Sequence, residues 1–338
     1  MSTVTAAALC FAGLCVFGLS GGEAAPSSPD TSRIAFASHR DGNWEIYVSD
    51  ADGQNQTRLT RRNGHTRFPL WSADRTKIAF AGQIGGGEGW EFWVMNADGS
   101  GARRLFAGLV GKSHREWSRE GRRIAVTAEI AGNVDVYVVD VASARMTRVT
   151  SSPAVDRDPT WSPDGRYIAF SSERDGNREI YVARADGSEL RRLTNNARTD
   201  ASPVWSPDGT RILFVSDRDG TSELYVIGPD GSALERLTTD AHSSRDAPRW
   251  SPDGSHIAFQ IADKGRYDVG LFRLRDRKQR VLVGTEHQDG SYTWSPNSKE
   301  LAYISSRAGA ETLNVIEIET NRTRQITTSW SLTPDWAR

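Results

Sequence analysis

The sequence predicts an all-β protein, a seven-bladed β-propeller of four-stranded antiparallel blades whose ring is closed by the C-terminal strand. The first observation is a tryptophan that recurs every 42 to 46 residues, at Trp71, Trp117, Trp161, Trp205, Trp250, Trp294 and Trp336. The second is that the same short parts follow each tryptophan in the same order. The third is an incomplete unit at each end of the array.

The N-terminal segment predicts export. Residues 6–19 are apolar but too few to span a bilayer, and small residues follow at Gly22 and Ala24, so we interpret residues 1–25 as a signal peptide cleaved near Ala24. Residues 1–5 contain no Lys or Arg, which indicates either an unusual signal or a start codon elsewhere. Both cysteines, Cys10 and Cys15, lie in this segment after leucines, so we expect neither a disulfide nor a lipid anchor.

Charge argues against two classes of partner. The chain has 42 basic and 43 acidic residues and a formal net charge of −1, so nothing in this balance favours nucleic acid or an anionic membrane surface. After a linker at residues 26–32, no further apolar stretch of membrane length occurs. We expect a periplasmic or secreted monomer with one domain, residues 33–338.

Each repeat contains the parts of a four-stranded blade. In residues 161–194, apolar runs at 168–170 and 180–182 are separated by a Gly turn, and a second Gly turn precedes a Leu-Thr pair. Runs of β-branched and aromatic residues between such turns are typical of strands buried on both faces, as in a blade that its neighbours cover. We expect each tryptophan to begin the packing layer of the innermost strand.

The two ends of the array complete each other. The apolar run at residues 34–36 has no tryptophan before it, and Trp336 has no run after it. We therefore expect residues 332–336 to supply the missing strand of the first blade and to leave no open sheet edge.

The repeat resembles the TolB-type, WD40-like (PD40-type) β-propeller family. The pattern Trp-Ser-Pro-Asp-Gly, Ile-Ala-Phe, Asp-Gly, Ile-Tyr-Val, Asp-Gly, Leu-Thr is best kept at residues 161–194 and 205–238 and is degraded at 117–150 and 257–284. The resemblance implies a propeller, but TolB carries a smaller α/β domain before six blades, whereas this array counts to seven. Similar blades also precede the hydrolase domain of prolyl-oligopeptidase relatives, and no such domain is expected here.

Loops in such a blade alternate between two faces, and the more varied face is expected to surround the mouth of the central channel. The links to the next tryptophan lie there, at residues 61–70, 107–116, 151–160, 195–204, 239–249, 284–293 and 328–335. Loops on a rigid scaffold commonly carry binding residues. The candidate binding residues are His65, Arg67, His114, Arg115, Asp156, Arg157, Asp200, Arg245, Asp246, His287, Asp289 and Trp330, beside Asp158 and His242.

Two interpretations of these side chains stay open. The aspartates can bond neighbouring backbone amides in Asx turns, with the histidines as ordinary exposed loop residues. Alternatively, histidines that converge on the axis can hold a transition metal. We expect no cofactor, and the identity of any metal is unknown.

The predicted function is that of an exported, non-catalytic scaffold that binds an envelope protein, a peptide or a glycan. The alternative is a metal-dependent carbohydrate-active enzyme, because the fold is similar to that of oligogalacturonate lyases, which hold a metal in the channel. The chain has no His-x-His pair to match that site and no Gly-x-Ser-x-Gly motif for a hydrolase. Fold alone does not decide between these functions.

Overall fold

Every regular element in the described residues of the computed structural model is a β-strand. These residues are 32–84, 89–109, 114–239, 244–263, 266–284, 289–307 and 310–337, and the predicted signal peptide and nearly all of the linker lie outside them. Within these ranges the chain has no helix with the length and apolar character of a membrane span. The predicted all-β class is confirmed.

The strands form antiparallel sheets of the predicted kind, and five of those described have four strands. The first contains β28 (Ser331–Trp336), β1 (Arg33–Ser38), β2 (Glu45–Asp50) and β3 (Thr57–Arg58). The next two contain β12 (Asp156–Trp161), β13 (Tyr167–Ser172), β14 (Glu179–Arg184) and β15 (Arg191–Arg192), then β16 (Asp200–Trp205), β17 (Ile212–Ser216), β18 (Glu223–Ile227) and β19 (Glu235–Arg236). The last two contain β20 (Ser244–Trp250), β21 (His256–Asp263), β22 (Arg266–Arg273) and β23 (Lys278–Val283), then β24 (Asp289–Trp294), β25 (Glu300–Arg307), β26 (Ala310–Glu317) and β27 (Thr323–Gln325).

The remaining sheet has eight strands, where the repeat predicts two separate sheets of four. It contains β4 (Gly64–Trp71), β5 (Lys77–Ile84), β6 (Trp90–Asn96), β7 (Arg103–Leu109), β8 (Arg115–Trp117), β9 (Arg123–Ile130), β10 (Asn133–Asp140) and β11 (Met146–Arg148). The two halves join where Leu109 of β7 pairs with Ala128 of β9. Gly108 permits this approach, because a Cβ at its position would lie 2.6 Å from the carbonyl oxygen of Glu129.

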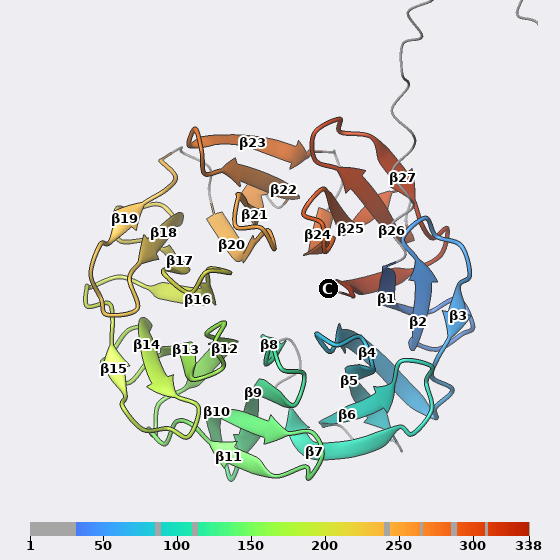
Figure 1. The fold of residues 1–338 in the computed structure, drawn as a ribbon, viewed down its shortest axis with the longest axis horizontal. Helices are drawn as coiled ribbons and strands as arrows, with labels where there is room; N and C mark the ends of the chain where they lie inside the picture. The colour runs from blue at the N-terminus through green and yellow to red at the C-terminus, as the bar shows by residue number, and fades with distance from the viewer. Residues whose placement is uncertain are drawn as a thin grey trace, which may run out of the picture. The chain divides into compact units, whose positions relative to one another are not determined.

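The C-terminal strand lies beside the first strand of the array. β28 pairs antiparallel with β1 in a register that places Trp336 opposite Ile34 and Ser331 opposite Ser38. In Figure 1 the sheets of residues 33–337 follow one another in chain order around a common centre. The strands nearest this centre are named the inner strands here, and they are β4, β8, β12, β16, β20, β24 and β28.

The repeated tryptophans join neighbouring inner strands. The indole nitrogens of Trp117 and Trp161 donate to the carbonyl oxygens of Leu70 (3.0 Å) and Glu116 (3.1 Å), which directly precede the tryptophan of the previous unit. Trp250 and Trp294 repeat the contact. Each repeated tryptophan therefore packs between sheets, as predicted, but it is the last residue of its inner strand rather than the first.

A buried acid explains the Leu-Thr pair of the repeat. Glu179 begins β14 and is fully buried, and it accepts hydrogen bonds from the hydroxyl of Thr194 (2.6 Å) and from Arg192 (3.1 Å). The same hydroxyl accepts the backbone N–H of Ile180. Because a buried carboxylate is costly unless it is paired, this network fixes the fourth strand against the third. The first sheet repeats it around Glu45.

Candidate functional site

The antiparallel order sorts the connections onto two faces of the sheets. In the sheet of β12 to β15, the Ser-Pro-Asp-Gly turn after β12 and the Asp-Gly turn after β14 lie at one end of the strands, which we name the turn face. The turn after β13 and the link from β15 to β16 lie at the other end, which we name the link face. The alternation is the one that the sequence predicts.

Several predicted loop residues belong to inner strands. Arg67 lies in β4, Arg115 in β8, Asp156 and Arg157 in β12, and Asp200 in β16, so the interpretation of residues 151–160 and their equivalents as loops is wrong in part. The sequence before each tryptophan is polar and does not indicate a strand, because the apolar run lies in the next strand of the same sheet. The links that remain are shorter than predicted.

A bulge bends most inner strands three residues before the tryptophan. Phe68, Asp158, Ser202, Ala247, Ser291 and Thr333 all have φ values from 29° to 57°. The register of pairing shifts at the bulge in every one of these strands. A left-handed non-glycine residue costs about 1–3 kcal/mol, and such strain concentrates at functional sites. The bulges therefore mark the inner rim of the sheets as a place to look for function.

Two of the predicted aspartates have a structural partner. Asp156 and Asp200 are fully buried and form ion pairs with Arg174 (3.1 Å) and Arg218 (2.7 Å), which follow the second strand of the same sheet. Burial raises the pKa of Asp200, while the charge of Arg218 opposes that rise. The Asx-turn interpretation is wrong for these two residues, because their carboxylates accept hydrogen bonds from arginine side chains and, among the described contacts, none from an adjacent backbone amide. They hold the inner strand to its neighbour.

Arginines and aromatic rings gather on the link face around β4. The guanidinium of Arg67 lies 4.5 Å from the ring centroid of Trp44, and that of Arg115 lies 4.9 Å from the centroid of Phe68. Phe68 in turn meets the ring of Trp90 edge-on at 5.7 Å. We name this set the arginine–aromatic cluster, with the members Trp44, His65, Arg67, Phe68, Trp90 and Arg115.

The cluster spans separate parts of the array. Trp44 lies in the turn between β1 and β2, and its carbonyl oxygen accepts the backbone N–H of Thr66 in β4 (2.8 Å). The backbone N–H of Phe68 donates to the hydroxyl of Thr333 in β28 (3.3 Å). Segments from both ends of the array therefore fix the position of the cluster, and β8 contributes Arg115.

Burial shifts the ionisation of the cluster. It lowers the pKa of Arg67 and lowers the pKa of Arg115 to about 10, since desolvation disfavours the charged form. The pKa of His65 is also lowered, first by burial and then by the charge of Arg67. The Nδ1 atom of His65 and the Nε atom of Arg67 are buried and have no hydrogen-bond partner among the described residues. The cluster is a partly dehydrated, cationic surface.

The other predicted residues lie around the remaining inner strands. His114 precedes β8 and is half-buried, and Arg157 of β12 is also half-buried. Trp330 precedes β28, its side chain is 49% exposed, and its carbonyl oxygen accepts the hydroxyl of Ser38 (2.9 Å). The backbones of Arg245, Asp246 and Asp289 belong to β20 and β24, but their side chains, together with all of His242 and His287, lie outside the described residues.

Within the described ranges, no cluster of ligand side chains supports the metal interpretation. No group of three or more His, Cys, Asp or Glu side chains that could hold a metal ion occurs there. The predicted set draws on His287, whose position is not among those ranges.

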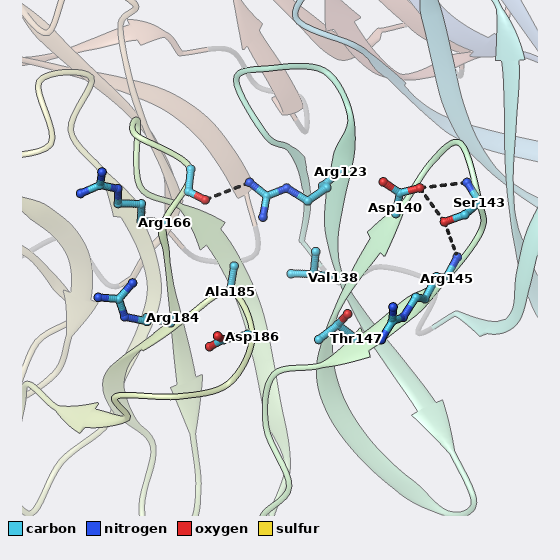
Figure 2. A pocket seen from close by; sticks show the side chains of 11 residues that line it. Arg123, Val138, Asp140, Ser143, Arg145, Thr147, Arg166, Arg184, Ala185 and Asp186 are labelled. Carbon is cyan, nitrogen blue, oxygen red and sulfur yellow. Dashed lines mark hydrogen bonds between the residues drawn. The ribbon is translucent and has the colours of Figure 1, made fainter.

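A polar groove of about 530 Å³ opens on the turn face, between the sheets of β8 to β11 and β12 to β15 (Figure 2). Arg123 crosses it and donates to the carbonyl oxygen of Gly165 (3.0 Å). Arg184 pairs with Glu189 at 2.6 Å, and Asp140 accepts the hydroxyl of Ser143. Arg123, Arg184 and Asp140 of this groove are thus partnered within the chain.

Sequence reasoning missed the aromatic half of the cluster. The chain has eleven tryptophans, and seven occupy the repeat position. Three of the others, Trp44, Trp90 and Trp330, lie on the link face near β1, β4 and β28. Tryptophans outside the repeat position were the available signal.

Comparison with known proteins places the chain in a family. The model of the TolB beta propeller domain, PD40, matches residues 116–337. The chain therefore belongs to the PD40 family of TolB-type β-propeller domains, as the repeat predicts.

Individual relatives resemble the chain over different lengths. A segment of 56 residues is 43% identical to the Tol-Pal system protein TolB of Desulfosudis oleivorans and covers 17% of this chain but only 13% of that protein. TolB from Acinetobacter baumannii has 19% identity and a TM-score of 0.60, over 87% of this chain and 79% of that one. An oligogalacturonate lyase from Vibrio parahaemolyticus has 15% identity and a TM-score of 0.71, over 86% and 88%. At these identities the two structures share the fold alone.

Proposed function

We propose that the chain is an exported, non-catalytic seven-bladed propeller that binds an envelope protein, a peptide or a glycan at its link face. It works as a monomer in the periplasm or outside the cell and needs no cofactor. The observation that carries the proposal is the arginine–aromatic cluster, a partly dehydrated cationic surface built by strands from both ends of the array. Trp and Arg are the residues most enriched at the energetic centres of protein interfaces.

The ring of seven blades is supported by contacts between inner strands. Tryptophan indoles join β4 to β8, β8 to β12, β16 to β20 and β20 to β24. β12 packs against β16, and the backbone N–H groups of Trp336 and Trp71 donate to Thr293 of β24 and Asp335 of β28. In this proposal the eight-stranded sheet counts as two blades that touch at Leu109 and Ala128.

A role in the bacterial envelope is supported by kinship and by the N-terminal sequence. The Desulfosudis relative is named a Tol-Pal system protein, and the chain begins with a segment that resembles a secretory signal. The relative matches over a small part of its length, so its own partners are not transferred to this chain. The partner is instead defined by the surface that the cluster offers.

Capture of a partner from an envelope extract tests this function. A variant with Arg67, Arg115, Arg157 and Arg245 changed to Ala is expected to lose the partner that the intact chain retains, because the cationic surface is removed. The matched control changes Arg119, Arg122, Arg275 and Arg322, four exposed arginines of the turn face, and is expected to keep it. Equal capture by both variants contradicts a binding role for the link face.

The enzymatic alternative has its own test. The likeness to the Vibrio lyase concerns the fold, so a metal-dependent enzyme is distinguished by composition and not by shape. Elemental analysis of the purified chain is expected to show no stoichiometric Mn, Zn or Ca. A metal that is bound stoichiometrically and lost when His65, His114 and His287 are changed together would favour the enzyme.

A further inference from the structure

Arg67 is a cation without an ion pair. No carboxylate of the described residues lies within ion-pair distance of its guanidinium, and its Nε atom is buried without a hydrogen-bond partner. Glu311, at the start of β26, is the acid whose charge acts on Arg67, and it does so from beyond ion-pair distance. Arg174 and Arg218, which follow the second strands of their sheets, differ from Arg67 because each pairs with a buried aspartate.

The ring beneath Arg67 orients its free donors. A guanidinium that lies over an aromatic face keeps its N–H groups at the edge, where they form a planar fork that matches a carboxylate. Arg67 lies over Trp44 and Arg115 over Phe68, the residue that follows Arg67. Two adjacent inner strands thus each carry a guanidinium that lies over an aromatic ring. The stacking reduces the conformational entropy that a ligand must remove on binding.

The surroundings of the two arginines favour an anion from outside. A half-buried cation loses part of its hydration, and an anion in contact offsets that cost; among the described residues no carboxylate forms an ion pair with Arg67. Phe68 and Trp90, which are half-buried, supply apolar contact area at the same place. An exposed tryptophan, Trp330, lies nearby, because its carbonyl oxygen accepts the backbone N–H of His39, whose ring contacts Trp44.

We propose that Arg67 and Arg115 bind a carboxylate of an acidic peptide segment in the partner protein, with Trp44 and Phe68 as the platform that holds both guanidiniums. This inference rests on the proposed binding function and gives its ligand a chemical class. A peptide is favoured over a uronate sugar because the site combines tryptophan with stacked arginine, the pairing that dominates protein interfaces.

Titration of the full-length chain with acetylated hexaglutamate, followed by calorimetry at low salt, tests the proposal. Hexaglutamate is expected to bind, and hexaglutamine is not. The substitution Arg67→Gln is expected to weaken binding by about tenfold or more, because a charge-assisted pair is lost. Two controls separate this from bulk charge. Arg322→Gln removes an exposed arginine of the turn face, and Glu311→Gln removes the acid whose charge acts on Arg67; neither is expected to weaken binding.

Thermal melting of each variant shows that it is folded. Unchanged affinity in Arg67→Gln, equal weakening in Arg322→Gln, or binding of hexaglutamine as tight as that of hexaglutamate would each overturn the proposal. Tetragalacturonate that binds while hexaglutamate does not would also overturn it, in favour of a sugar. The two proposals fail separately. If Arg67→Gln still captures the envelope partner, the carboxylate inference is wrong and the binding function stands. If the intact chain binds hexaglutamate but captures no partner, the proposed binding function is wrong and the carboxylate site stands.

Discussion

At the scale of the residue, a buried ion pair ties each well-kept inner strand to its neighbour. Asp200 of β16 is fully buried, and the side chain of its partner Arg218 is only 16% exposed. Arg218 also lies over the ring of Tyr225, so its position is fixed from two sides. Removal of one member of such a pair leaves the other charge buried without compensation.

The substitution Asp200→Ala is therefore expected to lower the free energy of unfolding by about 3–5 kcal/mol. Urea denaturation monitored by tryptophan fluorescence measures the change. Asp186→Ala is the control, because this aspartate lies in an exposed turn and bonds to Ser188. Equal effects of the two substitutions would show that the buried pair does not hold the strand.

Three tyrosines give the fold a predictable response to alkali. Burial, followed by the hydrogen bond to Asp41, raises the pKa of Tyr47 to about 12. Burial and the equivalent hydrogen bonds to Asp175 and Asp219 raise the pKa of Tyr181 and Tyr225. The unfolded chain loses these protons near pH 10, before the folded chain does. Stability is thus fully present below about pH 10 and falls as the pH rises toward about 12.

Urea denaturation at a series of alkaline pH values checks this dependence. The variant with all three tyrosines changed to Phe is expected to show a flatter decline than the intact chain, because the groups that titrate differently in the two states are gone. An equally steep decline in both chains would assign the alkaline loss to other groups.

The residue scale also shows what sequence could not supply. The tryptophan spacing can be seen in the sequence because the repeat imposes it. Asp156 and Asp200, in contrast, have the polar sequence of a loop. Their partners Arg174 and Arg218 are 18 residues further on, so no local pattern reveals the ion pairs. Likewise, the position of Arg67 in a predicted link makes it a candidate, whereas its platform Trp44 lies in the turn between two strands of another sheet. Contacts across sheets depend on the fold and leave no local signature.

At the scale of the element, β7 shows how one glycine changes a sheet. The backbone of Gly108 has a φ of 88°, and its Cα faces the carbonyl oxygen of Glu129 so closely that a methyl group would clash. The repeat pattern is degraded at residues 117–150, but it gives no indication of the direct pairing of β7 with β9. The close approach of β7 to β9 depends on a glycine at one position, and a repeat pattern does not identify the effect of a single residue.

The substitution Gly108→Ala is expected to destabilise the chain by about 1–3 kcal/mol, as it adds both backbone strain and a clash. Gly132→Ala separates the two effects, since Gly132 has a φ of 80° with no heavy atom within 4 Å of its added Cβ. We expect a larger loss at Gly108 than at Gly132 in the same denaturation assay. Equal losses would mean that the junction of β7 and β9 tolerates a side chain.

At the scale of the whole molecule, the proposed ring depends on the C-terminal strand, β28. β28 pairs with β1, its Trp336 is fully buried, and its Thr333 supports the cluster through Phe68. Without β28 the edge of β1 in the first sheet is open, and the link face loses the strand that contacts Phe68. The proposed ring and the proposed binding surface therefore share the same structural requirement.

The melting temperature of a chain that ends just before Leu332 tests this requirement most directly. Because the cut removes the buried Trp336 and exposes the edge of β1, the account predicts a melting temperature well below that of the intact chain, measured by circular dichroism. A shortened chain that melts at the same temperature as the intact one would contradict the closed ring and, with it, the binding surface that we place at its mouth.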